Sequence, residues 1–317
     1  MSIKHRTIGK GVLAALKLTG MAAMALSFIM MTVLAGCDNG AGPGPGEENE
    51  FTITSAAEWN AAIAAIEAAG GGTFSAPKEY LMTITGTISL PGRDIRYAHD
   101  ATIQASYISI TLKGAGTLSL SSEGSLFTVG DLSQYSNIYD QTLIIDGPTL
   151  RGIDENAYAL VCVYDGALEL RSGTITGNTN EGYGGGVYMG EDAGSFTMSG
   201  GTISGNEAGQ HGGGVCMERD AGSFTMSGGT ISGNETGECG GGVYITVDFD
   251  KTGGTIYGSD ASEADNKNTA SDTDGHAVYY VKSNYYYRDL TLDDSDDIST
   301  STLPETGTGN NWTKKES

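Results

Sequence analysis

Acidic side chains that could bind a metal gather in one loop, between residues 259 and 274. Closely spaced carboxylates offer the oxygen ligands that a hard cation such as Ca²⁺ prefers. A run of charge can equally serve only to keep a surface hydrated. We therefore predict a weak calcium site at most, with no other cofactor, and its candidate ligands are Asp260, Glu263, Asp265, Asp272 and Asp274.

Aromatic side chains form a second group of candidates. Tyrosines cluster after the last repeat of the sequence, and Tyr183 and His211 occupy matching positions in two bends of the repeat. Such rings stack on sugars or on partner proteins, although the β propensity of tyrosine would also place it there without a ligand. The predicted ligand-contacting residues are His211, Tyr183, Tyr279, Tyr285, Tyr286 and Tyr287.

The chain has four cysteines, of which Cys162 and Cys216 each follow a strand valine. These two lie two repeats apart, so stacked repeats would separate their Cα atoms by roughly 9–10 Å, too far for a disulfide. No Cys–His spacing typical of a zinc site is present in the sequence. We predict free thiols at Cys162, Cys216 and Cys239.

The formal net charge of the chain is −22 at pH 7. A chain this acidic is repelled by nucleic acid and by anionic lipid headgroups. Nucleic acid is therefore excluded as a partner.

Residues 1–36 have the order of a secretory signal. Lys4, Arg6 and Lys10 precede an apolar run over about 18–35, which ends in Leu34-Ala-Gly-Cys37. This ending resembles the bacterial lipobox, and the resemblance implies that Cys37 is lipidated after cleavage on its N-terminal side. The alternative is an uncleaved membrane helix, because the run approaches the ~20 apolar residues that span a bilayer.

Residues 37–50 are rich in glycine and contain no large apolar side chain, which predicts a flexible tether between the lipid and a folded domain. We expect an exported protein of the bacterial cell envelope. Its membrane partner is reached through the lipid anchor, at the outer membrane or the cell surface.

Residues 51–79 are predicted to cap the folded domain with one amphipathic helix. Ser55-Ala-Ala-Glu58 is a capping-box pattern at the start of the helix. Trp59, Ala62, Ile63 and Ile66 then fall on one helical face. We expect Trp59 to plug the core, with sugar binding as the alternative.

An internal repeat dominates the rest of the chain. The thirteen residues Gly194–Asn206 recur unchanged at Gly222–Asn234, so that Asn206 and Asn234 are 28 residues apart. A fixed period of this size is typical of a solenoid. We predict parallel coils over residues 80–292 and a polar tail over 293–317.

Within one coil, three strands are expected, carrying Phe196 and Met198, then Ile203 after a glycine bend, then Val215 and Met217. Identical positions in successive coils should stack in register about 4.8 Å apart. Asn178, Asn206 and Asn234 fall at corners, where asparagine tolerates the left-handed backbone, and could form an amide ladder. Lys251 takes an inward position in the last coil.

The Gly-Gly-Thr-Ile and Ser-Gly-Asn pieces resemble two groups of proteins. One is the right-handed parallel β-helix superfamily, also called pectin-lyase-like, and the other is the repeat of bacterial polymorphic outer-membrane proteins. The resemblance implies an all-β, right-handed parallel β-helix with an N-terminal capping α-helix, and an exported setting. It does not imply catalysis.

We predict a noncatalytic display or adhesion scaffold that contacts a glycan, a host surface or an envelope partner. The alternatives are a carbohydrate-active enzyme of this fold, either a polysaccharide lyase or a glycoside hydrolase, and a purely structural spacer. For a lyase of this fold, the resemblance implies acidic calcium ligands beside an Arg or Lys base. Asp192 and Asp220 stack one coil apart without a basic residue that recurs beside them, and His211 and His276 look isolated.

Overall fold

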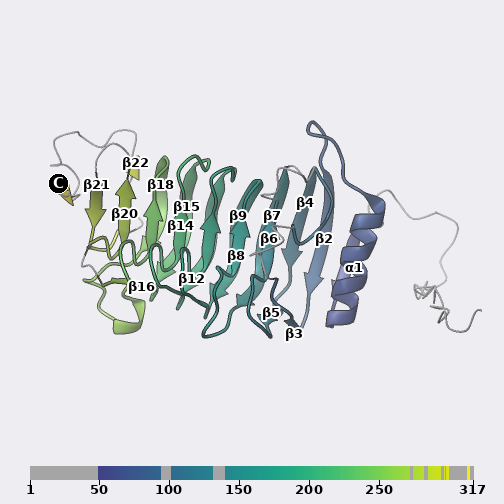
Figure 1. Cartoon of the computed structure of the whole chain (residues 1–317), viewed down its shortest axis with the longest axis horizontal. Coiled ribbons are helices and arrows are strands. Elements are labelled where there is room, and N and C mark those ends of the chain that lie inside the picture. Colours follow the sequence, from purple (N-terminus) through teal and green to yellow (C-terminus); the bar gives the residue numbers. More distant parts are fainter. Residues whose placement is uncertain are drawn as a thin grey trace, which may run out of the picture. The chain divides into compact units, whose positions relative to one another are not determined.

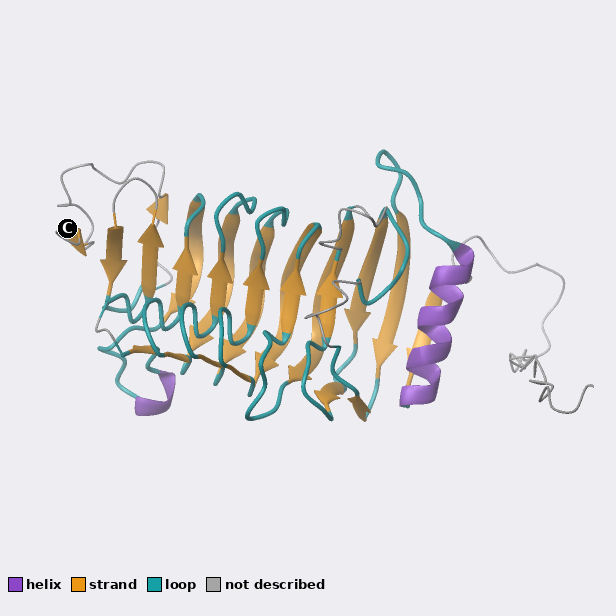
Figure 2. Ribbon diagram, in the orientation of Figure 1, coloured by secondary structure: helices purple, strands orange, loops and turns teal. Residues whose placement is uncertain are grey.

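The computed structural model describes residues 49–93, 101–130, 140–271, 274–281, 285–293, 296, 298–299 and 313–314. They form a parallel β-solenoid of about seven turns with one helix near its N-terminal end (Figures 1 and 2). The predicted β-solenoid with a helix near its start is thus confirmed, while its right-handedness stays a prediction. The predicted signal segment 1–36, Cys37 and the tether up to residue 48 lie outside the described residues.

Three sheets run along the stacked coils, and we name them the long sheet, the valine sheet and the short sheet. The long sheet contains β1 (Glu50–Ile53), β2 (Lys78–Ile84), β3 (Thr87–Leu90), β4 (Ile108–Lys113), β5 (Thr117–Leu120), β7 (Gln141–Arg151), β9 (Gly166–Thr176), β12 (Phe196–Ser204), β15 (Phe224–Ser232), β18 (Phe249–Ile256) and β22 (Ile298–Ser299). The valine sheet contains β6 (Phe127–Val129), β8 (Val161–Val163), β11 (Val187–Met189), β14 (Val215–Met217), β17 (Val243–Ile245), β20 (Val278–Val281), β21 (Tyr285–Arg288) and β23 (Thr313–Lys314). The short sheet contains β10 (Thr179–Asn180), β13 (Glu207–Ala208), β16 (Glu235–Thr236) and β19 (Thr269–Ala270).

Like residues stack on like residues in the core, as the repeat predicts. Phe196, Phe224 and Phe249 pair in register, with ring centroids 4.7 and 4.9 Å apart and nearly parallel planes. Met198 lies beside Met226 in the same register, and both are fully buried. Because each coil covers the apolar face of the next, the core is continuous from coil to coil.

The division of a coil into strands differs from the prediction. Phe196 and Ile203 belong to one strand, β12, and the glycine pair between them produces a register shift inside that strand. Gly201 has a φ of +75°, which lets the strand kink without ending. The predicted glycine bend between two separate strands is therefore wrong, and the corner comes later, where the short strand β13 follows Asn206.

A buried asparagine ladder ties the corners together and is longer than the predicted row. Besides Asn178, Asn206 and Asn234 it includes Asn156 and Asn268, and all five are at most 1 % exposed. Asn206 donates from Nδ2 to Oδ1 of Asn234 (3.1 Å), and Asn234 donates in the same way to Asn268 (3.0 Å). The ladder thus pairs buried backbone and amide groups where the coils turn, which regular sheet hydrogen bonds do not reach.

Both ends of the described solenoid are closed. At the start, α1 (Ala56–Ala69) buries Trp59 edge-on against Phe127, with ring centroids 5.5 Å apart, so Trp59 plugs the core. The Ser55 hydroxyl accepts from the Glu58 amide (3.3 Å), as predicted, but the Glu58 carboxylate reaches back to the Thr54 amide (2.7 Å).

At the other end, the inward Lys251 is 0 % exposed, and its ammonium donates to the carbonyl oxygens of Asp293 and Asp296. These bonds compensate a buried charge that would otherwise be very costly. Two short strands of the predicted tail, β22 and β23, pair with β18 and β21. The described part of 293–317 therefore closes the last coil.

The ladder yields a stability prediction. Asn206→Ala removes the acceptor of the Asn178 amide and the donor to the Ile175 carbonyl and to Asn234. Each buried group left without a partner costs about 1–3 kcal/mol, so we expect the free energy of unfolding to fall by about 3 kcal/mol or more. Denaturant unfolding measures this. The exposed neighbour Glu207 is the control, because Glu207→Ala should change the stability by less than about 0.5 kcal/mol. Equal effects of the two substitutions would contradict the ladder.

Candidate functional site

The outer face of the valine sheet carries a row of cysteine and tyrosine side chains. In β11, Val187 and Met189 pack in the main core, and Tyr188 between them faces the other way, as strand alternation requires. The strands pair in register, so the middle residues form one row: Cys162, Tyr188, Cys216, Tyr244 and Tyr279. We call this the outer row.

Part of the outer row is a ladder of stacked rings. Tyr244 and Tyr279 stack with centroids 5.8 Å apart, and Tyr279 stacks on Tyr287 at 6.5 Å. His211 reaches in from its bend and stacks on Tyr244 at 4.3 Å and 6°, while Tyr183 lies 5.6 Å from His211. Four of the predicted contact residues, Tyr183, His211, Tyr279 and Tyr287, are therefore brought together, with Tyr244 as an unpredicted member. The side chains of Tyr285 and Tyr286 lie outside the described residues.

The ladder corrects the view that His211 is isolated. Besides its two ring neighbours, its Nε2 lies 3.3 Å from the Glu238 carboxylate. Stacked rings cover one another's faces, and Tyr279 is only 4 % exposed. The closed part of the ladder is therefore better suited to holding the coils together than to receiving a ligand.

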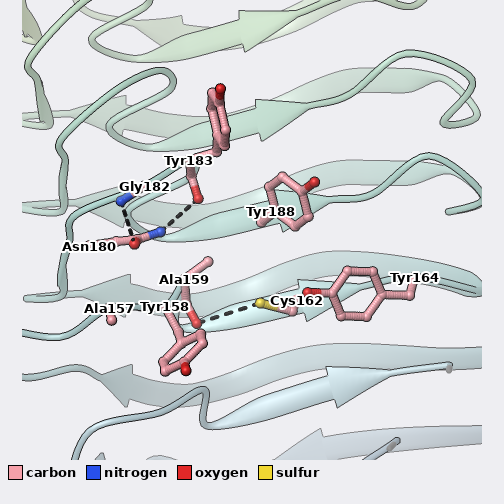
Figure 3. Close-up of a pocket in the computed structure, with 9 residues that line it drawn as sticks. All are labelled: Ala157, Tyr158, Ala159, Cys162, Tyr164, Asn180, Gly182, Tyr183 and Tyr188. Atoms are coloured by element: carbon pink, nitrogen blue, oxygen red, sulfur yellow. Dashed lines mark hydrogen bonds between the residues drawn. The ribbon is translucent and has the colours of Figure 1, made fainter. Parts of the chain in front are cut away.

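The ladder ends at Tyr183, and a hollow of about 230 Å³ lined by Tyr183 and Cys162 lies there. We call it the tyrosine hollow. Four tyrosine rings line it, with Cys162 and Asn180 also in its wall (Figure 3). Cys162 has no ring where the row has one at Tyr188, Tyr244 and Tyr279. The other cysteine of the row, Cys216, does not line the hollow, and His211 stacks on Tyr244 beside it. The four rings are Tyr158, Tyr164, Tyr183 and Tyr188.

Hydrogen bonds of the two neighbouring corners hold this wall in place. The Tyr158 carbonyl accepts from the side chains of Asn156 (3.1 Å) and Asn178 (2.8 Å), so the asparagine ladder positions one side of the hollow. Asn180 donates to the Tyr183 carbonyl (2.7 Å) and accepts from the Gly182 amide (2.8 Å). These bonds fix the bend that carries Tyr183, a residue that is 38 % exposed.

A second hollow, of about 320 Å³, adjoins the first through shared walls. We call it the acidic hollow, and it is lined by Tyr164, Tyr188, Gly190, Glu191 and Glu218. Burial raises the pKa of Glu218, and the nearby Glu191 carboxylate raises it further. Burial, followed by the charge of Glu218, raises the pKa of Tyr188. The Tyr188 phenol therefore keeps its proton at neutral pH and can donate a hydrogen bond.

The predicted calcium ligands are spread along their loop. Oδ1 of Asp260 accepts from the amide and the hydroxyl of Thr291, both at 2.7 Å. Asp265 belongs to a short 3₁₀ helix, η1 (Ala264–Asn266), and Glu263 precedes it. Asp272 lies outside the described residues. Where the chain is described, no three His, Cys, Asp or Glu side chains are grouped to hold a metal, so the calcium site stays a prediction.

As predicted, the described cysteines form no disulfide, and all three are buried: Cys162, Cys216 and Cys239. Burial raises the pKa of the Cys162 thiol to about 11. Although it lines the tyrosine hollow, this thiol stays protonated at neutral pH and is a poor nucleophile.

A third hollow, of about 390 Å³, lies on the outer face of the long sheet and brings acidic and basic groups together. Glu50 and Glu79 line it with Lys113 and Arg171. Arg171 is engaged by the Glu169 carboxylate at 2.7 Å, and Lys113 lies 3.9 Å from Asp146. Both cations thus have a carboxylate neighbour already, which makes them weaker candidates for a catalytic base.

Comparisons with protein families, with curated proteins and with solved structures found no match to this chain. What the fold defines is the class of parallel β-solenoids. The similarity to pectin-lyase-like proteins and to polymorphic outer-membrane repeats stays a prediction. Among the described residues, no helix combines the length and the apolar character needed to cross a bilayer.

Sequence reasoning missed Tyr158, Tyr164 and Tyr188 as site residues. A signal was present in the aligned repeats. Val161-Cys-Val stands where other coils have Val187-Tyr-Met and Val243-Tyr-Ile. The row has rings at Tyr188, Tyr244 and Tyr279 and cysteines at Cys162 and Cys216, and the hollow lies at the first of the two cysteines.

The buried thiol yields a prediction of pH dependence. The folded pKa of Cys162 is about 11, whereas an exposed thiol in the unfolded chain titrates near ~8.5. The unfolded chain thus releases this proton first, so the stabilising contribution is complete below about pH 8.5 and is lost as the pH rises toward the folded value.

We expect this contribution to be about 3 kcal/mol, since one pKa unit corresponds to ~1.4 kcal/mol. The free energy of unfolding of the wild-type chain and of Cys162→Ala is measured between about pH 7 and about pH 11. The wild-type stability should fall more steeply than that of the variant. Parallel curves would show that the thiol is not buried as described.

Proposed function

We propose that this chain is a noncatalytic, lipid-anchored protein of the bacterial cell envelope that contacts a glycan through the tyrosine hollow. The observation that supports this most is the hollow itself, a concave wall of four tyrosine rings at the end of the ring ladder. Binding sites for small ligands are typically concave, aromatic and supplied with a few polar groups. The tyrosine phenols supply those groups here.

Sugars suit this wall for two physical reasons. Their apolar C–H faces pack against aromatic rings, whose faces carry a partial negative charge. Their hydroxyls pair with neutral phenols and with carboxylates, and the pKa of Tyr183 and of Tyr188 is raised above the usual range, first by burial. The rings are therefore uncharged hydrogen-bonding partners at neutral pH.

The scaffold supports display rather than turnover. The asparagine ladder and the stacked core hold the lining residues of the hollow on in-register strands. Such strands support a binding wall rigidly. The thiol in the hollow is protonated, and Arg171 of the long sheet is engaged by Glu169. The predicted lipid at Cys37 and the tether 37–50 would place this wall outside the membrane surface.

A glycan array probed with the full chain in detergent tests this function. We expect binding to at least one glycan class, without cleavage of any polysaccharide. Tyr188→Ala should weaken that binding about tenfold or more, because a ring contact contributes ~0.5–1.5 kcal/mol beyond the area that it buries. Tyr244→Ala is the matched control, since Tyr244 belongs to the same outer row but does not line the hollow.

Three outcomes would argue against the proposal in different ways. Turnover of a polysaccharide would favour the carbohydrate-active enzyme. Binding only to a host or envelope protein would move the function to a protein partner. A chain that binds no glycan and no protein would favour the structural spacer.

A further inference from the structure

The tyrosine hollow and the acidic hollow share two walls, Tyr164 and Tyr188. These two rings meet edge to face, with centroids 6.0 Å apart and planes at 64°. Both rings belong to the lining of both hollows, and Tyr164 is 5 % exposed. A ligand group at the junction therefore lies within reach of both rings.

Charge at the junction is negative. Glu191 and Glu218 line the acidic hollow, and the residues that line either hollow include no lysine or arginine. Burial is the main reason that the pKa of Glu218 is raised, with Glu191 adding a like charge and the neighbouring Arg219 partly offsetting it. A positive charge placed here would offset the cost of burying the charged Glu218 carboxylate. It would also offset the repulsion between Glu218 and Glu191.

We propose that the paired hollows select a glycan that carries a free amine, with the ammonium group held between Glu218 and the rings of Tyr164 and Tyr188. This inference rests on the proposed glycan-binding function and names its ligand class. A primary ammonium donates N–H groups to a carboxylate in a charge-assisted hydrogen bond. The same cation is attracted to aromatic faces within about 6 Å of a ring centroid.

Other ligands of similar size lack one part of this match. An N-acetylated sugar has neither the charge nor the ammonium donors. A quaternary ammonium has the charge but no N–H to donate to Glu218. An anionic sugar would be repelled by Glu191 and Glu218, and by a chain of net charge −22.

Two matched probes test the inference by calorimetric titration of the full chain in detergent. One is an oligosaccharide of β-1,4-linked glucosamine, titrated where its amines are protonated, and the other is its fully N-acetylated counterpart. We expect the free-amine form to bind about tenfold or more tightly than the acetylated form, because it adds a cation–π contact and an ionic hydrogen bond.

Glu218→Gln should weaken the binding of the free-amine probe more than that of the acetylated probe and so remove most of this preference. Glu191 is more exposed than Glu218. The second variant, Glu191→Gln, should also lower the preference for the free-amine probe. Glu235→Gln is the matched charge control, because it lies on the exposed side of the short sheet, outside both hollows. Tyr188→Ala should lower the affinity for both probes.

The outcomes separate this inference from the proposed function. Equal affinity for the two probes, or a preference that survives both glutamine variants, overturns the selection of amines while glycan binding stands. Failure to bind the free-amine probe when the array shows other glycans bound also overturns it. Failure to bind any glycan on the array overturns the proposed function itself.

Discussion

In-register pairing of parallel strands is the constraint on which the rest of this structure depends. Once successive coils align residue for residue, each side chain has its own counterpart as its neighbour, about 4.8 Å away. Phenylalanine then meets phenylalanine, and asparagine meets asparagine. Such neighbours are favourable only for residue types that pair well with themselves, namely apolar side chains, amides and aromatic rings. Charged residues are accordingly rare inside the described coils, and the buried Lys251 and Arg288 lie where the coils end.

The same constraint explains where a binding wall can arise. Perfect repetition produces closed stacks, in which the side chains of neighbouring coils cover one another's faces. An opening needs a departure from the repeat. Cys162 and Cys216 both depart from the rings of the outer row, and the hollow lies at Cys162, whereas beside Cys216 the ring of His211 stacks on Tyr244. The regular part of the molecule contributes by holding the surrounding rings, since the asparagine ladder fixes the carbonyl of Tyr158. Structural regularity and the candidate site are therefore parts of one arrangement.

Sequence reasoning reached the parts of the fold that the repeat period controls. The stacked Phe196 and Phe224, the corner asparagines and the capping helix all follow from spacing and from residue type. Asn156 and Asn268 escaped it because they lie 22 and 34 residues from their ladder neighbours instead of 28. The glycine pair at Gly200 and Gly201 was misread because glycine marks a kink and a corner equally well. The hollow was missed because a buried cysteine after a valine looks like an ordinary core residue until the rows are aligned.

The identical segments Gly194–Asn206 and Gly222–Asn234 have a genetic consequence. Recombination between them would delete or duplicate 28 residues, which is one whole coil, without altering the reading of any other coil. The tyrosine hollow lies before both segments, and the closure by Lys251 lies after them. Such events would lengthen or shorten only the part of the molecule beyond the hollow. The number of residues between the N-terminus and the tyrosine hollow would stay constant among variants of different length.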